Sequence, residues 1–426
     1  MLIIMITEKE KQILRDLAKS QAELAQSDKN ISLIDSWYKF NDSLDRHPLI
    51  MVEYESFGDD LKPELICESD LARKIEEQLR LQLSLPELIG DDRVIPDFFS
   101  VNLNVHTNNY GLELKHHRAS DGNNIAYKIE YPLANLTDDL HMLKPSSFSS
   151  DIDEARSYAN SVGEIIGDIL PVRIRNNSLL WRFALTQNVV QLMGMENFYL
   201  AMYEEPEELH QLMAFLRDDI LAFVKWQEEN GLLTPNWGNE HSGSNSYGFT
   251  NKLPTNSPSQ TDLLKGKTDI RLSDLWINTN SQESVGISKE CFTEFVLPYY
   301  VDICKRAGLV YYGCCEPVHM IFDGALDTLP NLRKLSVSPW CNEEDIAEKL
   351  QGKDIIYSRK PSPNYLGVGK ELDEDAFCSH IAATLNAAKG LPLEFTFRDI
   401  YTLSGNIPKL RRAVDLVRNL IDTNRY

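Results

Sequence analysis

What this sequence lacks excludes several classes of protein. No apolar stretch approaches the roughly 18 residues that a membrane-spanning helix needs. The opening apolar run, residues 1–6, is too short for the apolar core of a signal peptide, and Glu8 and Glu10 follow at once. The seven cysteines are odd in number and show no disulfide framework in their spacing. We therefore expect a cytoplasmic protein with reduced cysteines and no membrane partner.

Basic residues are few compared with acidic ones. The chain has 43 Lys and Arg against 64 Asp and Glu, which gives a formal net charge of -21. A surface of this charge repels nucleic-acid backbones and anionic lipids. We expect no nucleic-acid partner and a small-molecule substrate.

Glycine-rich phosphate-binding loops are also missing from the predicted strand ends, which argues against a nucleotide-binding open sheet. Short apolar runs alternate instead with amphipathic helical stretches, a pattern typical of parallel strands with crossover helices. The predicted strands are residues 49–53, 94–101, 179–185, 232–236, 274–278, 309–312, 332–337, 354–358 and 393–397. This pattern predicts an α/β fold, a (β/α)8 TIM barrel over residues 46–426. Residues 1–45 would form an N-terminal helical extension, and residues near 106–150 an irregular insertion.

The loop at 238–262 is rich in Gly, Ser, Asn, Thr and Pro. Loops of this length are often functional, and this one follows a predicted strand end. We expect a mobile lid that caps the barrel mouth and contributes Tyr247 or His241 to the pocket.

In barrels of this kind the active site lies at the carboxyl ends of the strands. Candidate residues are therefore the polar, thiol and aromatic side chains that follow each predicted strand. They are Glu53, Tyr54, Asn236, Trp237, Glu240, His241, Asn278, Gln282, Glu283, Cys314, Cys315, Glu316, His319, Trp340, Cys341, Arg359, Lys360, Arg398 and Asp399. Two alternatives are open for Trp237 and Trp340, which could line a pocket or belong to the core. Arg359 and Lys360 could bind a substrate carboxylate or form a solvated basic pair.

The segment Gly313–His319 contains adjacent cysteines, Cys314 and Cys315. Side chains alternate along an extended strand, so only one of the two thiols should face the barrel mouth. A thiolate near His and Glu side chains suits zinc, with His241 and Glu240 as further ligands. The alternative is a pair of buried packing cysteines and a surface histidine.

Several motifs together resemble the uroporphyrinogen decarboxylase superfamily. They are Asp274-Leu275-Trp276, Ser281-Gln282-Glu283, Pro298-Tyr299, Tyr312-Gly313-Cys314-Cys315-Glu316-Pro317, Ser336 to Trp340, and Lys360-Pro361. The resemblance covers roughly residues 150–420 and is nearest to the branch related to corrinoid methyltransferases. It implies a (β/α)8 barrel and zinc-dependent methyl transfer between a corrinoid on a partner protein and a thiol or pterin acceptor.

The sequence departs from both reactions of that superfamily. The region from Trp37 to Tyr54 lacks the arginine pair that the resemblance implies for decarboxylation. Tyr312 stands where the methyltransferase motif has histidine, Cys314 fits its cysteine, and Cys341 is the nearest substitute for a later cysteine. Cofactor-free decarboxylation of a porphyrinogen-like polycarboxylate and a non-catalytic corrinoid or small-molecule binding barrel remain alternatives.

The residue roles follow from the positions and the resemblance together. We assign the candidate residues to three roles: catalysis, cofactor binding and metal coordination. They are Gln282, Glu283, Glu316 and Tyr247 for catalysis; Trp237, Asn278, Trp340 and Lys360 for the cofactor; and Cys314, Cys315, His241 and Glu240 for zinc.

Overall fold

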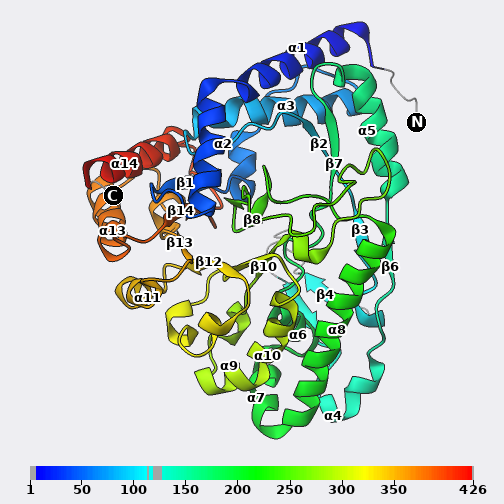
Figure 1. The fold of residues 1–426 in the computed structure, drawn as a ribbon, viewed down its shortest axis with the longest axis vertical. Coiled ribbons are helices and arrows are strands. Elements are labelled where there is room, and N and C mark those ends of the chain that lie inside the picture. The colour runs from blue at the N-terminus through cyan, green and yellow to red at the C-terminus, as the bar shows by residue number, and fades with distance from the viewer. Residues whose placement is uncertain (1–5, 113–114, 119–126, 425–426) are drawn as a thin grey trace.

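A computed structural model describes residues 6–112, 115–118 and 127–424 of the chain. Its centre is a six-stranded sheet in which every neighbouring pair is parallel (Figure 1). In spatial order the strands are β1 (Leu49–Val52), β14 (Leu393–Phe397), β13 (Ile356–Arg359), β12 (Leu332–Val337), β11 (Leu309–Tyr312) and β10 (Trp276–Thr279). The predicted α/β class is confirmed.

A second parallel pair, β2 (Phe99–Asn102) with β7 (Val172–Arg175), lies beside this sheet. Within the described residues no strand ladder joins this pair to β1 or to β10. Among the described residues, the predicted strand 232–236 also forms no strand ladder. The Asn236 side chain instead accepts the backbone N–H of Trp276 at 3.0 Å and donates to the carbonyl oxygen of Trp276 at 2.9 Å. The ladder therefore does not run round a closed barrel, and the barrel itself stays a prediction.

Helices connect successive strands of the large sheet, as the alternating pattern predicts. They are α9 (Lys289–Phe295), α10 (Leu297–Cys304), α11 (Glu343–Leu350), α12 (Asn364–Gly367), α13 (Glu374–Ala387) and, after β14, α14 (Pro408–Asn424). The predicted helix at 317–328 is wrong in type, because the chain forms two short 3-10 turns, η6 (Val318–Ile321) and η7 (Leu326–Thr328). Among the described residues, no helix is long and apolar enough to cross a membrane.

The N-terminal helices cover the β2–β7 pair. They are α1 (Glu8–Ala25), α2 (Asp28–Asn41), α3 (Asp70–Leu88) and, later in the chain, α5 (Ile152–Ile166). Leu14 of α1, Ile75 of α3 and Val162 of α5 are buried against Phe99 of β2 in one apolar cluster. The predicted division of the chain at residue 45 stays a prediction.

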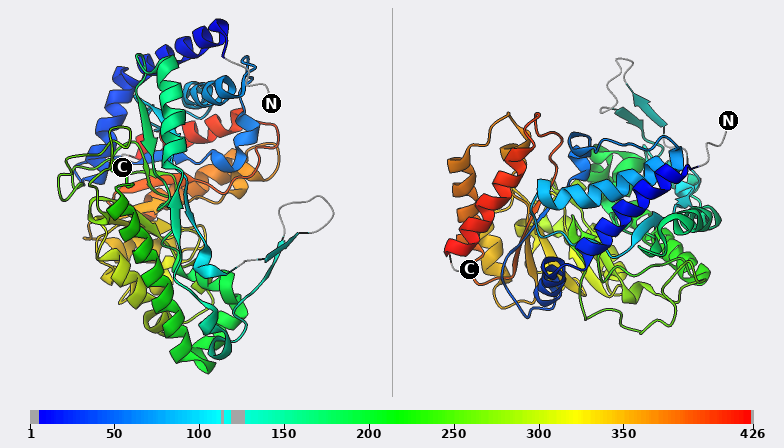
Figure 2. Two further views of the ribbon diagram at one scale, coloured as in Figure 1. Left: turned by 90° about the vertical axis from the view of Figure 1, so that its right-hand side faces the viewer. Right: turned by 90° about the horizontal axis from the view of Figure 1, so that it is seen from above.

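The insertion predicted near 106–150 contains two antiparallel strand pairs, one of which is a hairpin. The paired strands are β3 (Val105–Thr107) with β6 (Phe148–Ser150), and β4 (Lys115–Arg118) with β5 (Tyr127–Glu130). Short turns accompany them: η1 (Glu55–Leu61) earlier in the chain, then η2 (Asn109–Gly111), α4 (Leu136–Asp139) and η3 (Leu140–Met142). The β4–β5 hairpin extends away from the body (Figure 2), and residues 113–114 and 119–126 of the insertion lie outside the described part.

The predicted strand at 179–185 is wrong. The chain there forms turns, the actual strand β7 lies earlier, and α6 (Leu185–Met193) begins where the strand should end. An apolar run without a clear period does not distinguish a strand from a buried helix or turn. Two further helices follow, α7 (Met195–Glu204) and α8 (Pro206–Asn230).

The expectation of a mobile lid at 238–262 is wrong for residues 242–250, and for the remaining residues it stays a prediction. Residues 242–250 are buried, and β8 (His241–Gly243) pairs with β9 (Ser246–Tyr247) in a hairpin packed against the large sheet. The Ser246 hydroxyl donates to the Glu394 carboxylate at 2.8 Å, and Lys334 Nζ donates to the carbonyl oxygen of Tyr247 at 3.1 Å. We call residues 241–250 the plug. Small residues suit close packing as well as mobility, which is why composition alone was misleading.

Close packing of the plug predicts the effect of adding one methyl group. A Cβ on Gly248 would lie 2.0 Å from the carbonyl oxygen of Asn236, and a backbone atom cannot move aside cheaply. We expect Gly248→Ala to lower the free energy of unfolding by about 3 kcal/mol, measured by urea denaturation. Gly58→Ala is the matched control, because nothing lies within 4 Å of its added Cβ. Equal losses in the two variants would contradict tight packing of the plug.

Candidate active site

Cys314 and Cys315 follow the carboxyl end of β11. The chain turns there at Gly313, whose φ of 105° favours glycine and whose added Cβ would lie 2.9 Å from the Cβ of Ser336. The two Sγ atoms are 3.6 Å apart. The expectation that the thiols point apart is therefore wrong, because alternation applies within a strand and both cysteines lie beyond its end.

Cationic groups surround this thiol pair. Lys360, which is buried, donates from Nζ to the carbonyl oxygen of Cys314 at 2.7 Å. Arg398 follows β14 and is held by Ser244 of the plug at 3.1 Å and by ion pairs with Glu53 at 3.3 Å and Asp399 at 3.4 Å. The predicted pocket residue Lys360 thus faces the thiol site.

These neighbours make the two thiols unequal. The hydrogen bond from Cys315, helped by the charges of Lys360 and Arg398, lowers the pKa of Cys314 to about 6 against the opposing effect of burial. The same hydrogen bond, together with burial, raises the pKa of Cys315 far above its ordinary value. Of the two thiols, Cys314 is therefore the one that loses its proton first.

Glu316 holds two strand ends together. Its buried carboxylate accepts the backbone N–H of Ser281 at 3.0 Å and that of Cys314 at 2.8 Å, and burial raises its pKa. Ser338 donates to the Glu316 carbonyl oxygen at 3.2 Å. The carboxylate therefore positions the thiol loop, and its predicted catalytic role stays a prediction.

Gln282 and Glu283 lie in η5 (Gln282–Ser284), directly after β10. Gln282 is half-buried, whereas Glu283 is buried and accepts the hydroxyl hydrogen of Thr186 at 2.8 Å. Glu283 therefore fastens α6 to the sheet.

Glu240, His241 and Tyr247 line a different site, a cavity of about 370 Å³ beside the carboxyl ends of β1 and β2. Glu240 forms an ion pair with Arg175, and the His241 ring stacks on Tyr247 with the ring centres 5.3 Å apart. Burial lowers the pKa of His241 to about 4, so its imidazole is neutral near pH 7. Asn245, beside the Arg398 partner Ser244, also lines this cavity, so the plug adjoins both sites.

The predicted zinc ligands are not gathered into one site. In the described ranges, no group of three or more His, Cys, Asp or Glu side chains is arranged to hold a metal ion. The neighbours of the thiols are the cations Lys360 and Arg398 together with the carboxylates of Glu316 and Asp399, the latter 3.7 Å from the Cys315 sulfur. Cys341, the substitute ligand, is buried and directs its Sγ toward the Glu316 carbonyl oxygen at 3.8 Å. The side chains present do not fit a structural or catalytic zinc ion.

The remaining predicted cofactor-binding residues are dispersed. Asn278 is buried at the end of β10, Trp237 lines a separate cavity of about 730 Å³, and Trp340 is 74% exposed after β12. Sequence reasoning placed Arg398 and Asp399 among the candidates without a role and omitted Ser281. Asp399 has a φ of 60°, unusual for a non-glycine residue, but nothing in the local sequence marks it.

Comparisons with known proteins give little further identification. No model of a protein family matches the chain, and no curated protein matches it. Among solved structures, the chain is similar to a methyltransferase from Methanosarcina mazei. The two share 12% sequence identity, the match covers 91% of this chain and 98% of that chain, and the TM-score is 0.47. At this level of likeness, the function of this chain has to be argued from its own residues.

Proposed function

We propose that the protein transfers a methyl group and that the Cys314 thiolate takes this group from the donor. The observation that carries the proposal is the Cys314–Cys315 thiol pair at the carboxyl end of β11, with its Sγ atoms 3.6 Å apart and Lys360 bound to the Cys314 carbonyl oxygen. This setting lowers the pKa of Cys314. The sequence resemblance supports a methylated corrinoid on a partner protein as donor and a thiol or pterin as final acceptor.

The chemistry requires a nucleophile and later a leaving group. The Cys314 thiolate attacks the methyl carbon, a sulfur–carbon bond forms, and the cobalt–carbon bond breaks with its electron pair left on cobalt. The acceptor gives its proton to water and attacks the same carbon, and the sulfur–carbon bond of Cys314 breaks with its electron pair left on sulfur as the thiolate. Lys360 and Arg398 stabilise that thiolate, and a sulfur of low pKa leaves faster.

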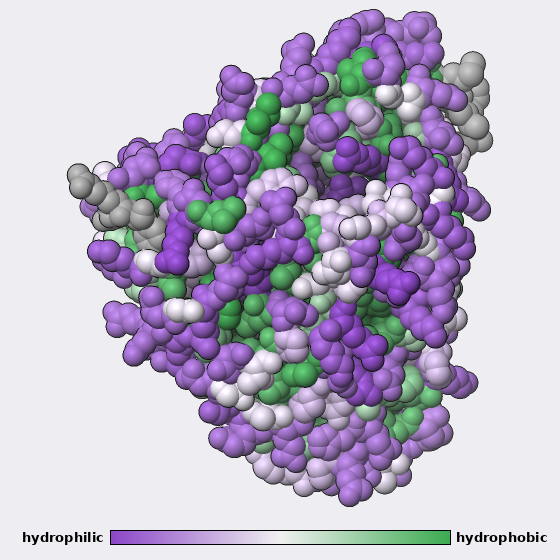
Figure 3. Space-filling model, viewed as in Figure 1, coloured by the Kyte–Doolittle hydropathy of each residue, from purple (hydrophilic) through white to green (hydrophobic). Residues whose placement is uncertain are grey.

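Exposed apolar side chains support a protein as the carrier of the donor. Five large apolar residues are exposed in segments that follow five strands of the large sheet, at the end where the thiols lie, and a sixth follows β7 and contacts Arg398. They are Trp181, Val285, Met320, Trp340, Val368 and Tyr401. Exposed apolar side chains mark an interaction site where they form a contiguous patch, and we propose that these do so around the thiol end of the sheet. The molecular face shown in Figure 3 is mostly hydrophilic, with hydrophobic residues in smaller areas.

Zinc has no part in this proposal, because the side chains around the thiols do not fit it. The positive charges of Lys360 and Arg398 supply the electrostatic stabilisation of a thiolate that the resemblance assigns to zinc.

Anaerobic incubation with methylcobalamin tests the proposal. We expect the wild-type protein to convert it to cob(I)alamin, seen by absorbance, and to gain one methyl group on the peptide that contains Cys314. Addition of 2-mercaptoethanol should then allow repeated turnover. Cys314→Ser should lose both reactions, because an uncharged hydroxyl is a far weaker nucleophile.

The matched control is Cys315→Ser, which keeps a donor beside Cys314 and should keep the reaction. Unchanged methylcobalamin with the wild-type protein would contradict the proposal and favour the decarboxylase or binding-only alternatives. Elemental analysis of the same samples tests zinc, and stoichiometric zinc that disappears in Cys314→Ser would reinstate the metal mechanism.

A further inference from the structure

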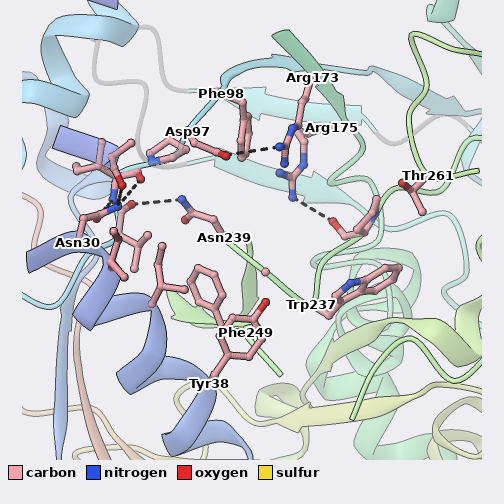
Figure 4. Close-up of a pocket in the computed structure, with 18 of the residues that line it drawn as sticks. Asn30, Tyr38, Asp97, Phe98, Arg173, Arg175, Trp237, Asn239, Phe249 and Thr261 are labelled. Atoms are coloured by element: carbon pink, nitrogen blue, oxygen red, sulfur yellow. Dashed lines mark hydrogen bonds and ion pairs between the residues drawn. The ribbon is translucent and has the colours of Figure 1, made fainter. Parts of the chain in front are cut away.

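A second, larger cavity of about 730 Å³ lies between α2, the segment before β2 and the chain that follows residue 235 (Figure 4). Val94, Pro96, Phe98 and Asn239 line both this cavity and the cavity of about 370 Å³. They form a wall that the Asn239 amide strengthens by donating to the Val94 carbonyl oxygen at 3.4 Å. The lining residues of the larger cavity do not include Cys314, Cys315, Lys360 or Arg398, so this cavity is separate from the proposed methyl-transfer site.

Two arginines form the basic side of this cavity. Arg173 and Arg175 are two residues apart on β7, so they share a face of the strand, and their guanidinium carbons lie 4.4 and 5.1 Å from the centre of the Phe98 ring. Figure 4 shows both guanidinium groups beside Phe98. Like charges this close are unfavourable unless anions compensate for them.

The anions present compensate for the two arginines only in part. Arg173 is half exposed and lies 3.6 Å from Asp97, beyond hydrogen-bond distance. Arg175 is 7% exposed, pairs with Glu240 and donates to the Pro235 carbonyl oxygen at 3.0 Å. Its buried Nε has no hydrogen-bond partner within the described residues. Burial and the charge of Arg173 lower the pKa of Arg175 in spite of the ion pair with Glu240.

Aromatic side chains form the other side. Tyr38 of α2 contacts Phe249 edge to face, with ring centres 5.3 Å apart, and Trp237 lies across the opening from them (Figure 4). Rings placed in this way suit the flat body of a ligand. Ligand cavities commonly enclose 300–1,000 Å³, with a few polar groups that fix orientation.

We propose that this cavity binds a small molecule that joins an anionic group, such as a carboxylate, sulfonate or phosphate, to a flat apolar body. Arg173, whose side chain is half exposed, binds the anion, and the buried Arg175 adds its positive charge beside it. Trp237, Tyr38 and Phe249 pack against the body. Guanidinium groups suit oxygen anions because their N–H donors lie in one plane.

The probe for the test is 8-anilinonaphthalene-1-sulfonate, an aromatic anion, compared with the neutral dye N-phenyl-1-naphthylamine. Fluorescence titration should show one saturable site for the anion. Arg173→Gln should weaken anion binding about tenfold or more, the effect of losing a hydrogen bond to a charged group. Binding of the neutral dye should change little, and Trp237→Leu should weaken both dyes.

Controls make the outcome decisive. Arg173→Lys keeps the charge and should retain most of the anion affinity, and Arg412→Gln removes an exposed arginine of α14 and should change nothing. Alkylation of Cys314 should leave dye binding unchanged, which separates this site from the proposed function. Absence of saturable anion binding, or equal affinity in the wild-type protein and Arg173→Gln, would overturn the proposal.

Discussion

Iodoacetamide should alkylate Cys314 with a midpoint near pH 6, because its neighbours lower the thiol pKa from the ordinary 9.0 to about 6. Thiolate is the reactive form, so the rate should rise through pH 6 and be constant above about pH 7. At pH 7 the ionised fraction should exceed that of an ordinary thiol by about 100-fold. Peptide mass spectrometry after short exposures at several pH values measures the effect.

Variants separate the causes of this shift. Lys360→Met removes a nearby positive charge and should move the midpoint upward, whereas Cys315→Ser keeps a hydrogen-bond donor and should retain reaction near neutral pH. Cys314→Ser should abolish fast alkylation of this peptide. A wild-type midpoint near 9, or fast alkylation that persists in Cys314→Ser, would show that Cys314 is an ordinary packing cysteine.

Removal of the Glu316 carboxylate should destabilise the fold more than most single substitutions. Glu316→Ala leaves the backbone N–H groups of Ser281 and Cys314 buried without their acceptor. Each such group costs about 1–3 kcal/mol, so the free energy of unfolding should fall by about 2–6 kcal/mol in urea denaturation. Glu316→Gln keeps one acceptor oxygen and should cost about half as much.

The pH dependence of this effect has a definite sign. Burial raises the pKa of Glu316 above its ordinary 4.5, so the folded protein resists its ionisation. Its contribution to stability should be fully present below pH 4.5 and should decline as pH rises through the raised value. Glu348→Ala, at an exposed position on α11, is the control and should change stability by no more than about 0.5 kcal/mol. A similar loss in both variants would refute the bridging role of Glu316.

The sequence predicted the large sheet well, because short apolar runs bounded by helical periods leave few alternatives. The bounds of β11, β12 and β14 agree with the predicted strands, and β13 begins two residues later than predicted. The strand prediction for residues 179–185 is wrong because an apolar run without a clear period is compatible with a strand, a buried helix or a turn. The lid prediction is wrong for the plug because Gly, Ser and Asn are common both in mobile loops and in segments that pack closely.

The site was predictable only in part. Position after a strand correctly brought Cys314, Cys315, Glu316 and Lys360 into one region, since parallel strands end at one edge. The same rule did not show that Arg398 would be oriented by Glu53 and Ser244, which lie far apart in the sequence. It also grouped Glu240 and His241 with the thiols, although the ion pair with Arg175 and the ring of Tyr247 hold them at another cavity.

The pairing of β1 with β14 has a consequence for how the chain matures on the ribosome. Leu49 of β1 lies opposite Glu394 of β14, so the partner of β1 is synthesised only near the end of translation. Glu394 is also the acceptor for Ser246 and the partner of Lys334 at 3.4 Å, so the interior charges balance only when β14 arrives. Until then the nascent chain exposes an unpaired strand edge, the kind of surface that chaperones cover. A chain that stops before residue 393 would therefore be an aggregation-prone fragment rather than a smaller folded protein.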